Sequence, residues 1–197
     1  MKFSLTVVTA TLAVFRTVLQ AAATDVFPGS DAKSDGDFAV KEKDDRLLIW
    51  DATFHPDKRD IAFGDQEEMG FGARVATPMT EKIGGRIVNS NGLQTAAKTW
   101  GQPAKWCDYA GTVGDLQGGI TLMAAPTNFR ESWWHNRDYG VFVANPFGRA
   151  AMKQGEQSLV TVKSGESLRI TFGALMHNGI NIDTAAEYAE FEELQKP

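Results

Sequence analysis

The sequence contains one cysteine, three histidines and no block of basic residues, and each shortage argues against a class of protein. A single cysteine, Cys107, allows no intramolecular disulfide, so stability has to come from core packing. The three histidines lack the short spacings of metal ligands, so we expect neither a metal site nor a cofactor. Positive and negative charges are intermixed and sum to -5, which offers nucleic acid no surface to bind.

The first two dozen residues are typical of an export signal. Lys2 precedes an apolar run over residues 3–15, and the small residues at 21–23 suit a signal peptidase. The run is shorter than the roughly 18 to 20 residues that span a bilayer, so we expect no transmembrane segment. Because Arg16 interrupts the run, an uncleaved start stays open as an alternative. The sequence therefore predicts a secreted or periplasmic protein.

Composition divides the rest of the chain into two parts. We expect the signal peptide to occupy residues 1–23 and a flexible leader, rich in Gly, Ser and Asp, to occupy residues 24–37. Hydrophobic residues make up 43% of the 197 residues, which is enough for one sizeable core. The sequence therefore predicts a single β-rich domain over residues 38–197.

Alternating apolar and polar residues predict strands in that domain. The pattern runs over residues 48–54, 119–123, 139–143, 159–162 and 167–172. Short strands separated by Gly- and Asn-rich turns are typical of antiparallel sandwiches and barrels. We therefore expect an all-β, antiparallel, β-sandwich-like domain, with a hairpin turn at residues 164–166. Its exposed sheet edges favour a homodimer or a partner that covers them.

One helix is predicted, at the C-terminus. Thr184 and Glu187 have the spacing of a capping box, in which each side chain binds a backbone N–H at the helix start. Tyr188, Phe191 and Leu194 then form an apolar stripe that can pack on a sheet.

The segment 126–148 has the highest density of chemically active side chains. Asn128, Arg130, His135, Arg137 and Asp138 surround two tryptophans there, Trp133 and Trp134. As a binding loop, it would hold a sugar or carboxylate through directional hydrogen bonds and indole stacking, and a His beside an Asp suits proton transfer. An equally good interpretation is an internal Arg–carboxylate network with the tryptophans in the core.

A second candidate segment is acidic and punctuated by glycine. Asp65, Glu67 and Glu68 lie within residues 63–72, and Glu68 with Asp138 would supply the two carboxylates of glycoside chemistry. A solvated acidic turn is the alternative. His177 is expected to be a solvated residue at a strand end, although a position beside His135 stays open.

Several distinctive sequence blocks follow one another in order along the chain. They are Phe63-Gly64-Asp65, Gly72-Ala73-Arg74, Gly85-Arg86-Ile87, Trp106-Cys107-Asp108-Tyr109, Trp134-His135-Asn136-Arg137-Asp138-Tyr139-Gly140 and Asn145-Pro146-Phe147-Gly148. These blocks, spread over about residues 45–194, resemble the C-terminal half of a secreted bacterial family labelled methane oxygenase PmoA. The resemblance implies a β-sandwich-like fold, without an established activity. Family members are longer and carry an upstream histidine-rich segment that this chain lacks.

The resemblance and the loop chemistry together give the expected site. We expect His135, Asp138 and Glu68 to be catalytic and a set of six residues to bind ligand: Asn128, Arg130, Trp134, Arg137, Tyr139 and His177. The expected function is a secreted carbohydrate-related protein, a hydrolase, a lyase or a sugar-binding protein, with a small molecule or oligosaccharide as ligand. The alternatives are a non-catalytic module or truncated family remnant and, third, a metal-dependent oxygenase as the family label suggests.

Overall fold

The computed structural model describes residues 33–42 and 46–196, with side chains from residue 46 onward. The strands are β1 Lys33–Glu42, β2 Arg46–His55, β3 Ile61–Phe63, β4 Phe71–Arg74, β5 Arg86–Asn89, β6 Trp106–Val113, β7 Leu116–Ala124, β8 Trp133–Asn136, β9 Val141–Asn145, β10 Val160–Val162 and β11 Leu168–Asn178. Helix α1 is a single turn, Ala96–Thr99, and α2 spans Thr184–Glu193. Two 3-10 turns, Thr77–Met79 and Glu81–Ile83, lie between β4 and β5.

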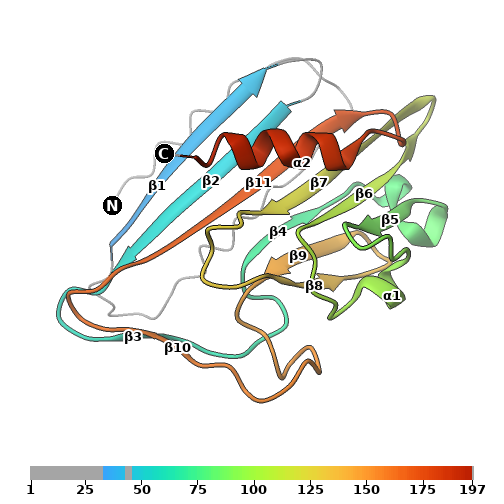
Figure 1. Cartoon of the computed structure of the whole chain (residues 1–197). Coiled ribbons are helices and arrows are strands. Elements are labelled where there is room, and N and C mark those ends of the chain that lie inside the picture. The colour runs from blue at the N-terminus through green and yellow to red at the C-terminus, as the bar shows by residue number, and fades with distance from the viewer. Residues whose placement is uncertain (1–32, 43–45, 197) are drawn as a thin grey trace.

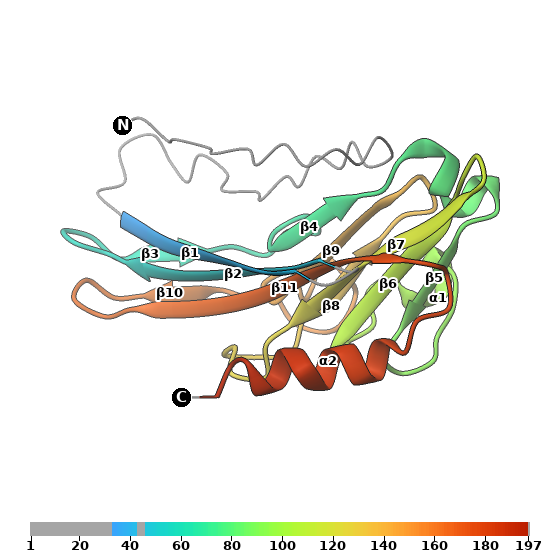
Figure 2. The same cartoon turned by 90° about the horizontal axis from the view of Figure 1, so that it is seen from above.

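The strands form three antiparallel sheets. A six-stranded sheet has the order β1-β2-β11-β7-β6-β5, a three-stranded sheet has the order β4-β9-β8, and β10 pairs with β3. Figure 1 shows α2 running along the six-stranded sheet, and Figure 2 shows α2 and β4 on opposite sides of it. The all-β, sandwich-like prediction with one C-terminal helix is confirmed.

Aromatic packing joins the two larger sheets. The ring of Phe71 on β4 stacks on Trp50 of β2 and Phe172 of β11, at centroid distances of 5.7 and 5.4 Å. On the other face of the six-stranded sheet, Tyr188 and Phe191 of α2 are buried in a smaller cluster. Both faces of the sheet are therefore covered, which is why its central strands carry long apolar runs.

The helix begins where the sequence predicts, but its cap differs. Asp183 is the N-cap residue, and its carboxylate accepts a hydrogen bond from the backbone N–H of Ala186. Asp caps a helix as well as Thr does, and here it stands one residue earlier. Tyr188 and Phe191 are buried as expected, whereas Leu194 is 48% exposed because it lies past the last helical turn.

The expected hairpin at residues 164–166 is a turn, but it does not join two paired strands. The backbone N–H of Glu166 donates to Lys163 O, yet β10 pairs with β3, and β11 pairs with β2 and β7. Asp60, in the turn after β2, accepts hydrogen bonds from Lys163 Nζ and the backbone N–H of Ser164. The turn after β2 and the turn after β10 therefore bind each other side by side. A local sequence pattern cannot reveal which distant strands pair.

The domain begins earlier than composition suggests. Strand β1 starts at Lys33, so residues 33–37 of the expected leader are extended and paired with β2. Polar residues suit an edge strand, because its outer side does not need to be buried. The expected signal peptide lies outside the described residues. Among the residues described, no helix has the length and apolar character to span a membrane.

Candidate functional site

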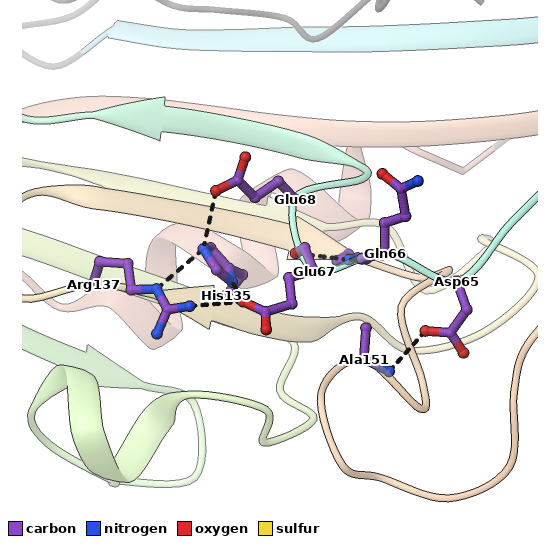
Figure 3. Close-up of polar contacts among 8 residues, drawn as sticks. Asp65, Gln66, Glu67, Glu68, His135, Arg137 and Ala151 are labelled. Atoms are coloured by element: carbon purple, nitrogen blue, oxygen red, sulfur yellow. Dashed lines mark hydrogen bonds and ion pairs between the residues drawn. The ribbon is translucent and has the colours of Figure 1, made fainter.

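A cluster of two carboxylates, an imidazole and a guanidinium lies where the segment before β4 meets β8. His135 Nδ1 is 3.2 Å from Glu67 Oε2, and His135 Nε2 is 3.7 Å from Glu68 Oε1. Arg137 donates from Nη2 to Glu67 Oε2 at 2.6 Å and from Nε to His135 Nε2 at 3.3 Å. Figure 3 shows the four side chains turned toward one another. We call these residues the Glu68–His135 site.

The side chain of Asn145 fixes the acidic segment in place. Its amide N–H groups donate to Gln66 O and Glu67 O at 2.7 and 2.9 Å, and its oxygen accepts from the backbone N–H groups of Phe147 and Gly148. Asn145 is completely buried at the end of β9. Because two of these hydrogen bonds join β9 to residues 66–67 and the other two hold the Asn145 side chain in place, the carboxylates of Glu67 and Glu68 are presented to β8 in a fixed direction.

Asp65 anchors a neighbouring segment rather than facing a ligand. Its carboxylate accepts hydrogen bonds from the backbone N–H groups of Ala150, Ala151 and Ser158 at 2.7 to 2.9 Å. Partial burial favours the neutral acid, but these hydrogen bonds outweigh it and hold the pKa of Asp65 below its usual value. Asp65 therefore stays ionised and positions the turn at residues 149–155 beside the site.

His135 is held as a neutral imidazole. Burial, with a side chain only 1% exposed, is the main cause that lowers its pKa, and the positive charge of Arg137 adds to it; Glu67 and Glu68 oppose the shift. Because Arg137 donates to Nε2, we assign the ring proton to Nδ1. Nδ1 lies near Glu67 without a well-aligned hydrogen bond. The site thus combines an uncharged ring with an exposed carboxylate, that of Glu68.

The lowered pKa of His135 predicts acid sensitivity. Since the folded pKa lies below the unfolded value of about 6.5, the unfolded state binds more protons as the pH falls, and the free energy of unfolding decreases. This one group contributes at most about 1.4 kcal/mol per pH unit. We expect His135→Gln to flatten the stability profile between about pH 7 and pH 5, measured by urea unfolding.

The matched control is His55→Gln. His55 is exposed at the end of β2. This variant should keep the wild-type dependence on pH. An unchanged profile in His135→Gln would contradict the assignment of a neutral, buried ring.

Four of the predicted site residues lie away from the Glu68–His135 site. Asn128 exchanges two hydrogen bonds with the backbone of Thr171 and so ties its loop to β11. Arg130 donates to Ser158 Oγ and lies over the ring of Phe129. Asp138 pairs with Lys82 at 3.7 Å, and Tyr139 lies under Arg74 and Lys82. No hydrogen bond or ion pair joins Asp138 to Glu68 or His135 among the described side chains.

The remaining two belong to the interior. Trp134 has no exposed surface, and its Nε1–H donates to Ala104 O at 2.9 Å. For this tryptophan, the core interpretation holds. The expectation of a solvated His177 is wrong: it is 3% exposed, its Nε2 lies 2.8 Å from Asp108 Oδ1, and it does not meet His135. Asp108 lies on β6 of the same sheet, with β7 between it and β11, so a strand-end position did not mean exposure.

Sequence reasoning missed Trp100 and Lys153 as neighbours of the site. Arg137 Cζ lies 5.7 Å from the centroid of the Trp100 ring, and Lys153 Nζ lies 5.8 Å from it. Trp100 follows α1 and Lys153 lies in the turn at residues 149–155, both outside the conspicuous 126–148 segment, so only the fold brings them together. Across the described residues, no group of three or more His, Cys, Asp or Glu side chains is arranged to hold a metal ion.

Comparison with known proteins decides the family. A family of unknown function, DUF6807, matches residues 33–190. The chain belongs to DUF6807. The resemblance to a methane oxygenase PmoA family is therefore wrong, because the matched family is DUF6807 and no methane oxygenase family matches. No curated protein and no solved structure matches the chain.

Proposed function

We propose that the protein is secreted, binds a carbohydrate at the Glu68–His135 site and acts on it by proton transfer. The observation that carries the proposal is the exposed Glu68 carboxylate, 76% exposed, backed at 3.7 Å by the buried, neutral ring of His135. Because Glu68 reaches solvent beside a buried ring, its carboxylate can meet a ligand that approaches from outside. The signal-like start of the sequence supports secretion.

The exposure of each residue in the Glu68–His135 site determines its proposed role. Glu68 reaches solvent, so it is placed to take a proton from a sugar hydroxyl or to give one to a glycosidic oxygen. His135 and the Arg137–Glu67 ion pair lie on the protein side of Glu68. They determine the local charge around the Glu68 carboxylate. General acid–base catalysis of this kind contributes typically about 10²- to 10⁴-fold to a rate.

The test is to incubate the purified full-length chain with a panel of oligosaccharides and to analyse the products by mass spectrometry. We expect Glu68→Gln to lower turnover by about 10²-fold or more, because the amide cannot exchange the proton. The thermal unfolding temperature should stay within the wild-type range, since an exposed side chain contributes little to packing.

The control is Glu193→Gln, which removes an equally exposed carboxylate, 68% exposed, at the end of α2. This variant should retain full turnover. If Glu68→Gln also retains full turnover, Glu68 is not the acid or base.

A non-catalytic binding module is the second candidate. It is favoured by the position of Asp138, because the second carboxylate expected for glycoside chemistry pairs with Lys82 instead. This candidate predicts that a carbohydrate raises the unfolding temperature while no product forms. The same panel therefore separates the two functions.

A further inference from the structure

The Glu68–His135 site extends to an indole. Trp100 follows α1 directly and is partly exposed. Arg137 connects the two parts: its Nε reaches His135 Nε2 at 3.3 Å, and its Cζ lies 5.7 Å from the Trp100 ring centroid. One guanidinium therefore contacts both the imidazole of the site and the indole of Trp100.

Two donors at this end of the site have no acceptor among the described residues. The Nε1–H of Trp100 is shielded from solvent and makes no hydrogen bond to any of them. Lys153 is exposed, and its Nζ lies 5.8 Å from the Trp100 ring, with no carboxylate of residues 46–196 paired to it. By contrast, the charge of Arg137 is balanced by Glu67. The uncompensated charge beside the indole is thus positive.

The backbone holds Lys153 in this place. Its φ of 58° lies in the left-handed region, which a residue with a Cβ adopts rarely. Asp65 fixes the turn through the N–H groups of Ala150 and Ala151, and a Cβ at Gly101 would lie only 2.8 Å from Met152 O. The turn that carries Lys153 is therefore packed against the residue that follows Trp100.

We propose that Trp100 and Lys153 form a subsite for the carboxylate-bearing ring of an acidic sugar, a uronate. The inference rests on the proposed function, since it names the class of carbohydrate that the Glu68–His135 site takes. The apolar face of the sugar ring packs on the indole, and its carboxylate accepts from the Lys153 ammonium. Glu68, at the other end, is left for a hydroxyl or a glycosidic oxygen. This arrangement keeps the two carboxylates, that of Glu68 and that of the ligand, apart.

The test uses pairs of ligands that differ only in the carboxylate. Trimers of galacturonate, glucuronate and mannuronate are each compared with their carboxyl-reduced, neutral counterparts, and affinities for the full-length chain are measured by isothermal titration calorimetry. We expect at least one acidic trimer to bind ten-fold or more tightly than its neutral counterpart. We expect Lys153→Met to remove that preference without changing the affinity for the neutral trimer.

The control is Lys196→Met, which removes a lysine that is 64% exposed beyond α2 and should leave the preference intact. If neutral and acidic trimers bind equally, or if Lys153→Met keeps the preference, the uronate subsite is overturned while the Glu68–His135 site stands. If no trimer of either kind binds, the subsite and carbohydrate binding at that site are contradicted together.

Discussion

Asp108→Asn is expected to lower the free energy of unfolding by about 3 to 5 kcal/mol, the cost typical of breaking a buried ion pair. The Asp108 carboxylate has no exposed surface and accepts hydrogen bonds from His177, Thr121 and Arg86 at 2.8 to 3.0 Å. An amide keeps only one acceptor oxygen, so its NH₂ group would face a donor. The measurement is urea unfolding of the purified variant.

The matched control for Asp108 is Asp51→Asn. Asp51 on β2 also pairs with an arginine and a threonine, Arg169 and Thr171, but its partner Arg169 is 67% exposed. Solvent screens such a pair, so its loss should cost under about 1 kcal/mol. Equal losses in the two variants would contradict the burial of the Asp108 network.

Trp134→Ala is expected to lower the free energy of unfolding by about 3 to 5 kcal/mol, because it leaves a large cavity in the core. Trp134 is completely buried, and its Nε1–H is paired with Ala104 O. Its backbone also binds Gly101 and Gln102, so the cavity opens beside the segment that carries Trp100. Thermal or urea unfolding measures the loss.

The neighbouring Trp133→Ala provides the comparison. Trp133 is only half-buried and lies under the guanidinium of Arg130, with Cζ 5.8 Å from its ring. We expect a clearly smaller loss of stability, because solvent fills part of the vacated space. If Trp133→Ala proves the more destabilising change, the placement of the two indoles is wrong.

The strands were predictable from the alternation of side-chain types. The alternation at residues 119–123 and 168–172 falls within β7 and β11, because successive side chains point to opposite faces of a strand, although the structure buries both faces of these two strands over most of their length. The burial of His177 was not predictable, since its partner Asp108 is 69 positions away in the sequence and an isolated histidine carries no sign of a buried carboxylate. The same reasoning failed for the turn at residues 164–166, whose flanking strands pair with distant segments.

The candidate site was only partly predictable. Glu68, His135 and Arg137 stood out as reactive residue types, and the structure brings these three together. Asn128 and Asp65 also have hydrogen-bonding side chains, but these side chains bind backbone groups and anchor loops. Residue type alone cannot separate the two uses, because a hydrogen-bonding side chain serves the backbone as readily as a ligand.

The position of β11 limits when the chain can fold. β11 is the last strand, yet it lies in the middle of the six-stranded sheet, with Phe172 opposite Trp50 of β2 and Ala124 of β7. The sheet cannot close until nearly the whole chain has been synthesised. Folds dominated by such distant pairings take about milliseconds to seconds to form. The six-stranded sheet of a nascent chain therefore stays incomplete until translation is nearly finished.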